Sequence, residues 1–139
     1  GEGEGSALVC GGETGDEGGW FVPPTVFTGG KRTDHLFREG LFAPVLAVHK
    51  VASFEEGVEA ANDTIFGLTG AYFGRDEEKI ATAKRELFCG NLYINRKCTG
   101  ALVGVNPFGG FNMSGTDSKA GGRDYLLLFL QAKSISRLK

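Results

Sequence analysis

The chain has 139 residues, enough for one domain, and a domain of this size buries about two-thirds of its unfolded-chain surface. Its net charge is −2 and its pI about 5.7, with Lys and Arg scattered, which excludes the basic patch typical of nucleic-acid binders. No apolar run approaches the ~20 residues of a membrane helix. Three widely spaced cysteines and two separated histidines favour neither a disulfide framework nor a metal site, so we expect a cytoplasmic protein.

The N-terminal part predicts short, separated elements, because 23 glycines fall mostly at turns. The apolar run 7–10 predicts a buried strand. The run 20–27 is aromatic and β-branched, but two prolines interrupt it, so it predicts an edge strand or an extended segment. Residues 33–38 predict one helical turn. The continuous apolar run 42–51 is typical of a strand buried on both faces of a parallel sheet.

Two helices are predicted from their capping residues. Ser53 followed three residues later by Glu56 is typical of a capping box. Asp76 predicts the cap of a second helix, and Gly90 lies where a glycine ends one. Both segments carry apolar residues at helical spacing, which supports two amphipathic helices.

The remaining segments complete an alternating pattern. Strands are predicted at 68–73 and 92–94, a long loop at 96–119, helical spacing between 125 and 132, and a final strand at 134–138. The order strand, helix, strand, helix, strand predicts a parallel sheet with right-handed crossovers. We therefore expect one α/β unit.

A glycine-rich stretch from 106 to 129 is the strongest candidate for a ligand-binding loop. It has a turn at 107–110 and a second glycine pair at 121–122, before the predicted helix. Residues without a Cβ let backbone N–H groups approach a ligand, and free N–H groups at a helix start attract anions. A plain connecting loop explains any single glycine equally well. The whole stretch favours a loop that holds a carboxylate.

Four segments resemble the aldehyde dehydrogenase superfamily, and within it the 1-pyrroline-5-carboxylate (glutamate semialdehyde) dehydrogenases. These segments are W-F-V-P-P-T-V-F at 20–27, L-F-A-P-V at 41–45, G-N-L-Y-I-N at 90–95 and P-F-G-G-F-N-M-S-G-T-D-S-K-A-G-G at 107–122. The first three are similar to landmarks of the superfamily. The D-S-K-A-G-G part of the fourth is similar to the loop that anchors the substrate carboxylate in this subfamily.

The resemblance implies a fold and an activity. Residues 1–133 are expected to be the C-terminal part of the catalytic domain, a mostly parallel open sheet with flanking helices. Residues 134–139 are expected to be an oligomerisation strand. The parent protein is expected to be a homo-oligomer that oxidises L-glutamate γ-semialdehyde to L-glutamate with NAD, or NADP, in proline degradation. Much of that enzyme would then lie outside the present chain.

The catalytic residues are not expected in this chain. The resemblance implies a nucleophilic cysteine in a G-Q-x-C motif and an upstream glutamate base, and neither occurs here. Cys98 is a tempting substitute, because Arg96 and Lys97 precede it and neighbouring cations lower a thiol pKa. It follows the G-N-L-Y-I-N segment, however, whereas the family nucleophile precedes that landmark. We expect the isolated chain to be inactive, and Cys10 and Cys89 to be small core residues.

The cofactor contact is expected around residues 39–45. In relatives the corresponding segment reads E-E-I-F-G-P-V, and its second glutamate binds the nicotinamide ribose. Here Gly40 takes that place and offers no acceptor, so Phe42 and, by a backbone shift, Glu39 are the candidate cofactor-binding residues. A core position for Phe42 is an equally simple interpretation. We hypothesise that the parent holds the nicotinamide end less firmly than its relatives do.

The substrate contacts are expected at the second glycine pair. By the resemblance, backbone N–H groups of Gly121 and Gly122 hold the substrate carboxylate, and Phe129 lines the apolar wall. Lys119 is expected to be a solvated lysine. Asn95, at the end of a strand, is a weaker candidate for positioning the loop. Phe111, Met113 and Ser114 are expected to shape the loop.

Two alternative functions stay open. One is an aldehyde dehydrogenase for a different acidic semialdehyde, which the D-S-K-A-G-G string disfavours. The other is a truncated paralogue that acts as a ligand-binding or assembly module. In every case the expected ligand is a small molecule, with no role for nucleic acid or a membrane.

Overall fold

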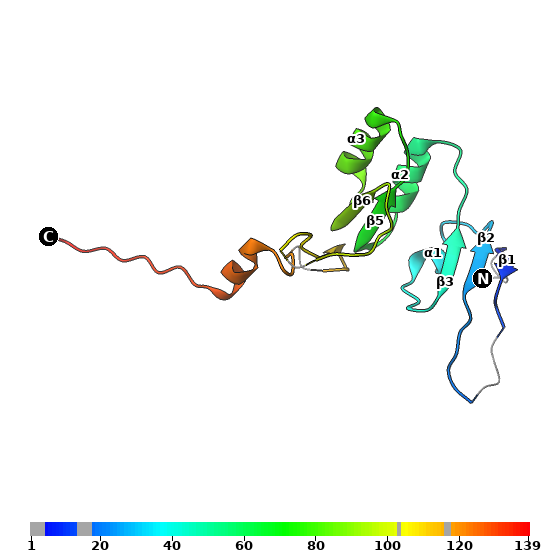
Figure 1. Cartoon of the computed structure of the whole chain (residues 1–139), viewed down its shortest axis with the longest axis horizontal. Coiled ribbons are helices and arrows are strands. Elements are labelled where there is room, and N and C mark those ends of the chain that lie inside the picture. The colour runs from blue at the N-terminus through cyan, green and yellow to red at the C-terminus, as the bar shows by residue number, and fades with distance from the viewer. Residues whose placement is uncertain (1–4, 14–17, 103, 116–117) are drawn as a thin grey trace. The chain divides into compact units, whose positions relative to one another are not determined.

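The structure is a computed structural model, and it describes residues 5–13, 18–102, 104–115 and 118–139. The chain forms two compact units, Gly1–Thr64 and Ile65–Lys139, which are called the N-terminal and the C-terminal unit below. Figure 1 labels the helices and strands of each. Within the described ranges, no helix is both long and apolar enough to cross a bilayer.

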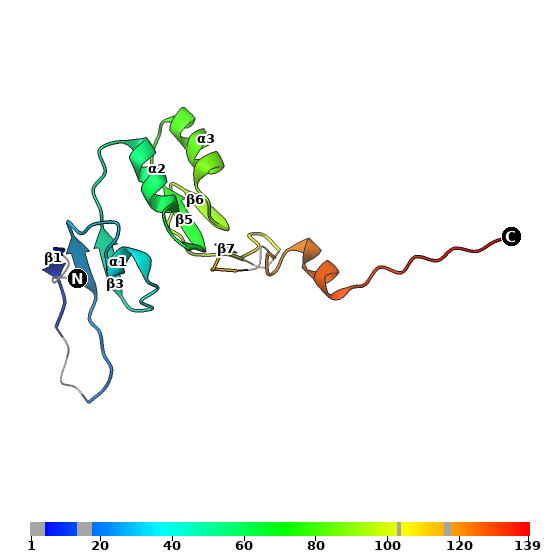
Figure 2. The ribbon, with the colours of Figure 1, turned by 180° about the vertical axis from the view of Figure 1, so that it is seen from behind.

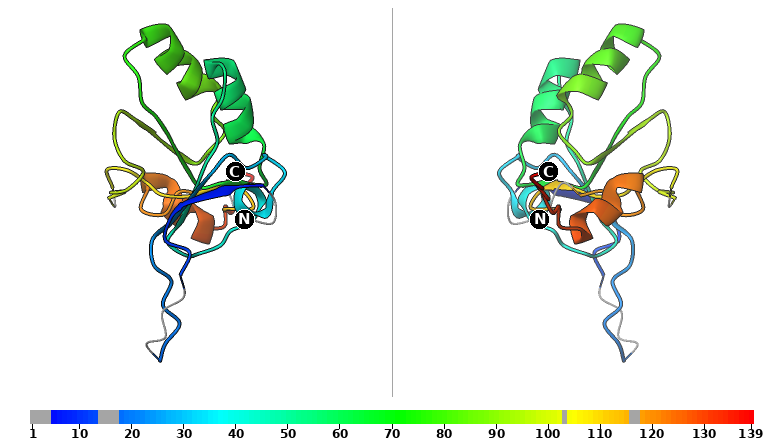
Figure 3. Two further views of the ribbon diagram at one scale, coloured as in Figure 1. Left: turned by 90° about the vertical axis from the view of Figure 1, so that its right-hand side faces the viewer. Right: turned by 90° about the vertical axis from the view of Figure 1, so that its left-hand side faces the viewer.

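The N-terminal unit contains a three-stranded sheet in the order β1 (Ala7–Cys10), β2 (Thr25–Thr28) and β3 (Val45–Val48). β1 pairs with β2 in antiparallel fashion, and β2 pairs with β3 in parallel over four residue pairs. The parallel pair is connected through the single-turn helix α1 (His35–Arg38), and α2 (Phe54–Asn62) follows β3. Both arms of the long connection between β1 and β2 extend away from this sheet (Figure 3).

Local side-chain contacts explain where α2 begins and ends. The Ser53 hydroxyl accepts a hydrogen bond from the Glu56 backbone N–H (3.1 Å), as the capping box predicts. The Glu56 carboxylate accepts from the Ala52 N–H (2.7 Å), one residue earlier than in an ideal box. At the far end, the Arg38 guanidinium binds both carboxylate oxygens of Asp63 (3.1 and 2.9 Å), which ties α1 to the end of α2.

The C-terminal unit contains a β-α-β motif. β5 (Thr69–Tyr72) and β6 (Asn91–Ile94) are parallel neighbours, and α3 (Glu77–Glu86) connects them. A second small sheet pairs β4 (Phe66–Gly67) with β7 (Phe111–Asn112) in antiparallel fashion. Figure 2 shows β7 on the segment that follows β6. The motif brings the start of β6 close to the glycine-rich loop that carries the candidate site.

The core of the C-terminal unit lies beneath α3. Asp76 caps this helix, because its carboxylate accepts from the backbone N–H groups of the second and third helical residues (3.0 and 3.2 Å). Ile80 and Ala83 of α3 and Tyr93 of β6 are the buried hydrophobic residues among those that the structure describes. The predicted helix and its cap are therefore confirmed, and they supply most of the core.

The expected single, mostly parallel sheet is wrong. The described strands form three small sheets: the mixed sheet β1-β2-β3, the antiparallel pair β4-β7 and the parallel pair β5-β6. The strand β3 pairs with β2 and not with β5, so the two parallel pairs belong to different sheets. Residues of β3 alternate between half-buried and exposed, so this strand is not buried on both faces. Apolar runs identified the strands of the parallel pairs, but a run does not determine which strand lies beside it.

The C-terminal end also differs from the expectation. Residues 123–129 form a 3₁₀ helix, η2 (Arg123–Phe129), which begins directly after Gly122 as predicted but ends before Ala132. Residues 130–139 are exposed and form no strand. A strand requires hydrogen bonds to a neighbouring strand, and the described residues provide none for this segment.

The chain exposes more surface than a folded domain of its mass. Its accessible area is 10885 Å², whereas a monomer of 14.8 kDa exposes about 7000 Å². Many large apolar side chains are exposed, including Trp20, Phe42 and Phe73.

Candidate functional site

The glycine-rich loop is attached to the first residue of β6. The Asn91 side-chain amide donates to the Pro107 carbonyl oxygen (2.9 Å), and its oxygen accepts from the Gly109 N–H (3.1 Å). One side chain thus satisfies two backbone groups of the turn at 107–110. Sequence reasoning missed this residue, although it is the first asparagine of the G-N-L-Y-I-N segment.

Lys119 is not the solvated lysine that the sequence suggested. Its ammonium group donates to the carbonyl oxygens of Gly90 (2.8 Å) and Gly109, and it lies 4.9 Å from the centroid of the Phe111 ring. An ammonium group has three donors and no acceptor, so two carbonyls and an aromatic face are suitable partners. The expectation was wrong because none of these partners is a sequence neighbour of Lys119. Gly90 lies 29 residues away and Gly109 lies 10 residues away.

Backbone segments approach very closely in this loop. A Cβ on Gly90 would lie 1.8 Å from the Gly109 carbonyl oxygen, and a Cβ on Gly109 would lie 2.4 Å from the Ser118 carbonyl oxygen. Phe108 and Ala120 exchange both backbone hydrogen bonds (3.0 and 2.8 Å). The two ends of the loop therefore meet, and the glycines make that contact possible.

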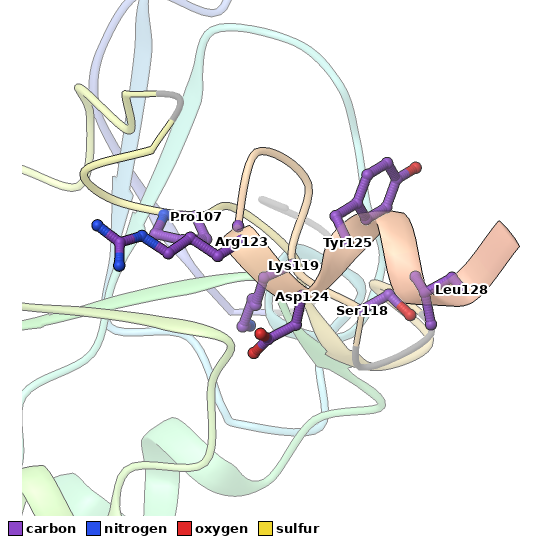
Figure 4. A pocket seen from close by; sticks show the side chains of 8 residues that line it. Pro107, Ser118, Lys119, Arg123, Asp124, Tyr125 and Leu128 are labelled. Carbon is purple, nitrogen blue, oxygen red and sulfur yellow. The ribbon is translucent and has the colours of Figure 1, made fainter. Parts of the chain in front are cut away.

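A cavity of about 440 Å³ lies where the loop enters η2. Its lining residues are Pro107, Ser118, Lys119, Gly122, Arg123, Asp124, Tyr125 and Leu128. Figure 4 shows the side chains of Arg123, Asp124 and Tyr125 leaving the start of η2 in different directions. The lining combines two cationic side chains and one carboxylate with an apolar side, a composition suited to a small polar ligand.

Gly122, Gly121 and Phe129 have different relations to this cavity. Gly122 lines it, and its N–H donates to the Lys119 carbonyl oxygen (3.2 Å). Gly121 has φ = 75°, a left-handed conformation that favours glycine, and its carbonyl accepts from Gly104 (2.7 Å). Phe129 is exposed, and its ring contacts Tyr125, with the ring centroids 5.4 Å apart. Neither Gly121 nor Phe129 is among the lining residues.

The other loop residues have structural contacts. The Ser114 hydroxyl accepts from the Gly67 N–H (3.1 Å), and the Met113 N–H donates to the Ile65 carbonyl oxygen (3.0 Å). Together with Phe111 in β7, these residues shape the loop as expected. Thr116 and Asp117 of the S-G-T-D-S-K-A-G-G string lie outside the described residues.

Asn95 holds a different segment from the one proposed. Its side-chain oxygen accepts from the Gly74 N–H (2.9 Å), and its amide donates to the Gly74 carbonyl oxygen (2.8 Å). These bonds join the carboxyl ends of β5 and β6. Within the described residues, Asn91, at the start of β6, therefore binds the glycine-rich loop, whereas Asn95, at the end of β6, does not bind it.

The candidate cofactor residues lie in the N-terminal unit. Glu39 ends α1, where its N–H donates to the His35 carbonyl oxygen (3.0 Å), and its side chain is exposed. Phe42 is 100% exposed and has φ = 52°. That conformation is strained for a residue other than glycine, and such strain is often found at functional sites. The alternative interpretation of Phe42 as a core aromatic is wrong for this structure.

The three cysteines lie in different environments. Cys98 and Cys10 are exposed, so the expectation that Cys10 is a core residue is wrong, because no described element covers β1. Burial raises the pKa of the half-buried Cys89 thiol, Cys98 raises it further, and Lys119 opposes the rise. A raised pKa keeps the thiol protonated and poorly nucleophilic. In the part of the chain that the structure describes, no cluster of His, Cys, Asp and Glu could hold a metal ion.

Comparison with known proteins agrees with the landmark segments. The model of the aldehyde dehydrogenase family matches residues 1–135, and the chain belongs to this family. It is 56% identical over 131 residues to a 1-pyrroline-5-carboxylate dehydrogenase of Bacillus pumilus, covering 94% of the chain and 25% of that protein.

Solved structures agree with this result. The 1-pyrroline-5-carboxylate dehydrogenase from Thermus with bound NAD is 50% identical, with a TM-score of 0.89, over 94% of this chain and 25% of that one. Lactaldehyde dehydrogenase from Escherichia coli has a TM-score of 0.86 but is 29% identical, over 94% and 27% of the two chains. The chain thus spans about a quarter of the length of these relatives.

Proposed function

We propose that the chain is the C-terminal portion of the catalytic domain of an NAD-dependent 1-pyrroline-5-carboxylate dehydrogenase. The whole protein would oxidise L-glutamate γ-semialdehyde to L-glutamate in proline degradation. One observation carries the proposal: the chain is 50% identical to the Thermus enzyme but 29% identical to a lactaldehyde dehydrogenase of nearly equal structural similarity. The sequence therefore favours one specificity within a shared fold.

The glycine-rich loop would bind the end of the substrate that is remote from the aldehyde. Glutamate semialdehyde carries its α-carboxylate there, and backbone N–H groups form strong hydrogen bonds to a carboxylate. Gly121 and Gly122 would donate these bonds, and Phe129 would contact the apolar part of the substrate. The cavity beside Gly122 supports this role. Since the Gly122 N–H already donates to Lys119, a bound carboxylate would have to compete for that bond.

The segment at 39–42 would contact the cofactor, which supplies the hydride acceptor of the reaction. The exposed ring of Phe42 fits a role in packing against the nicotinamide ribose. The exposed carboxylate of Glu39 could accept a hydrogen bond from a ribose hydroxyl, whereas Gly40 has no side chain to do so. Phe42 and Glu39 therefore fit contacts with the nicotinamide ribose. The hydrogen bond that a glutamate makes to this ribose in relatives has no counterpart at Gly40.

Catalysis requires residues outside this chain. The nucleophilic cysteine and the glutamate base would come from the remaining three-quarters of the protein, and the 139 residues alone would be inactive. The sparse core and large exposed apolar surface support this dependence. A homo-oligomer that uses residues 134–139 as a paired strand belongs to the same proposal.

The test begins with the coding sequence upstream of Gly1. An open frame that contains a cofactor domain and a G-Q-x-C cysteine is expected. The whole protein should then form NADH with glutamate semialdehyde and prefer it to C4 and uncharged aldehydes. A start codon immediately before the Gly1 codon, or equal rates with uncharged aldehydes, would contradict the proposal. NADH formation by the isolated chain that disappears in Cys98→Ser would overturn the predicted inactivity.

A further inference from the structure

Two polar side chains converge on Gly109, at the centre of the turn in the glycine-rich loop. Asn91 accepts a hydrogen bond from the Gly109 N–H, and Lys119 donates one to the Gly109 carbonyl oxygen. Both polar backbone groups of a single residue are therefore bound by side chains. Such a double attachment restricts the backbone at a position where glycine is otherwise very free.

Lys119 connects this turn to the candidate carboxylate site. Its ammonium group binds the carbonyl oxygens of Gly90 and Gly109, while its own carbonyl oxygen accepts from the Gly122 N–H (3.2 Å). The same residue thus contacts the start of β6, the turn and the residue before η2. A change in the position of Lys119 would move the Gly122 N–H.

The surroundings of Lys119 differ from those of two other lysines in the C-terminal unit. The side chain is half-buried, and the Phe111 ring lies 4.9 Å from its ammonium group. Lys84 and Lys97, in the same unit, are exposed. Hydrogen bonds from a charged donor in a partly desolvated place are stronger than those at the surface, so Lys119 stabilises the loop more than an exposed lysine would.

We infer that Asn91 and Lys119 are a pair of positioning residues that preorganise the described parts of the glycine-rich loop, 107–115 and 118–122, for the carboxylate end of the substrate. This inference rests on the proposed function. Neither side chain needs to touch the substrate, because both act through Gly109 and through the backbone that leads to Gly122. A preorganised site binds more tightly, because less conformational freedom is lost when the ligand arrives.

The first experiment measures the loop itself in the whole protein, by hydrogen exchange of the peptides that cover 107–122. Lys119→Met removes the charge and keeps the length of the side chain, and Asn91→Ala removes the amide. Amide exchange in these peptides is expected to become at least about tenfold faster in each variant, while the α3 peptides remain unchanged. Lys84→Met, an exposed lysine on α3, is the matched control and should leave the loop peptides unchanged.

The second experiment compares two substrates in the same variants. The KM for glutamate semialdehyde should rise about tenfold, which corresponds to one charge-assisted hydrogen bond, with kcat changed less than threefold. The kcat/KM for an uncharged aldehyde of similar length should remain within about twofold. In the double variant the two effects should be less than additive, because both residues act on Gly109.

Each result has a distinct meaning. Unchanged loop exchange in both variants would overturn the inference, whatever the activity. Faster exchange with equal losses for charged and uncharged substrates would show a purely structural role and would also overturn it. If the wild-type protein does not oxidise glutamate semialdehyde, the proposed function fails and the part of the inference that concerns the substrate fails with it. Faster loop exchange in the variants would in that case still support the positioning of the loop by Asn91 and Lys119. If Lys119→Met does not fold, Lys119→Gln replaces it: its amide still has N–H donors but no charge, and it should give intermediate values.

Discussion

The loop at 107–122 and the segment at 39–42 are the two places where this chain is proposed to meet small molecules, and they are constructed differently. The loop is held within its own unit by the side chains of Asn91 and Lys119 and by backbone hydrogen bonds between Phe108 and Ala120. The segment at 39–42 contains a fully exposed Phe42 in a strained conformation.

The two segments therefore differ in how far residues of this chain determine their conformation. The described parts of the glycine-rich loop, 107–115 and 118–122, are held by contacts whose two partners both lie within Ile65–Lys139. The cofactor segment has an aromatic side chain without a hydrophobic environment, which is unfavourable in water. We therefore expect mutations in the loop to change the fold and the substrate affinity, and mutations at 39–42 to change mainly the cofactor affinity.

The largest expected effect comes from Gly90→Ala. The new methyl group would lie 1.8 Å from the Gly109 carbonyl oxygen, which is backbone and cannot turn aside. Overpacking of this kind is expected to destabilise the protein by about 3 kcal/mol and to displace the turn. The measurement is the midpoint of thermal unfolding of the whole protein, together with the KM for glutamate semialdehyde.

Gly57→Ala is the matched control for that variant. Gly57 lies inside α2, and a Cβ there would meet only Val51, at an ordinary 3.5 Å. Alanine is favoured over glycine inside a helix by about 0.5–1 kcal/mol, so this variant should be slightly more stable. An unfolding midpoint for Gly90→Ala as high as that of the unmodified protein would contradict the close approach of the two segments.

The parts of the fold that depend on short-range contacts could be predicted from the sequence. Ser53 and Asp76 were identified as helix caps because their partners lie within three residues, and hydrogen bonds at such short separation have a sequence signature. The existence of the strands in the parallel pairs followed from apolar runs. These features depend on local chemistry alone.

Contacts between distant residues could not be predicted in the same way. β4 and β7 are two residues long each, too short for a periodic pattern, and they lie more than 40 residues apart. The partner Gly90 of Lys119 is 29 residues away, and Asn91 reaches Pro107 across 16 residues. Nothing in the composition around Lys119 distinguishes it from a solvated lysine. The resemblance pointed to the glycine-rich loop as the candidate site, but only the fold reveals which side chains hold that loop.

A smaller effect is expected from Gly122→Ala, which tests the carboxylate site directly. The backbone at Gly122 has φ = −82°, which alanine adopts readily, and a Cβ would contact Lys119 and Pro107 at 3.3–3.5 Å. Stability should change by less than about 0.5–1 kcal/mol. The KM for glutamate semialdehyde should rise about tenfold, because the methyl group enters the cavity that Gly122 lines. Equal changes for charged and uncharged aldehydes would argue against this assignment.

Phe42→Asn tests the other side of the comparison. Asparagine tolerates a positive φ better than phenylalanine, so the whole protein should be as stable as before or more stable by up to about 1 kcal/mol. The KM for NAD should rise several-fold while the KM for the aldehyde stays the same. Phe42→Leu keeps the strain and an apolar side chain, and it separates the backbone effect from loss of the ring. A rise in the aldehyde KM alone would assign Phe42 to the substrate and not to the cofactor.

The smallest expected effect is a gain, from Gly40→Glu. Glycine at this position offers no acceptor to the nicotinamide ribose, and Gly40 lies next to Glu39 in an exposed segment without regular structure. A carboxylate that accepts hydrogen bonds from ribose hydroxyls should lower the dissociation constant of NAD about threefold to tenfold, or raise kcat if orientation of the nicotinamide limits turnover. Gly40→Gln has a similar length without the charge and should give a smaller gain. Isothermal titration with NAD and steady-state kinetics on the whole protein measure both quantities. If neither changes, the parent already binds its cofactor through other residues, and the cofactor segment is not the weaker of the two sites.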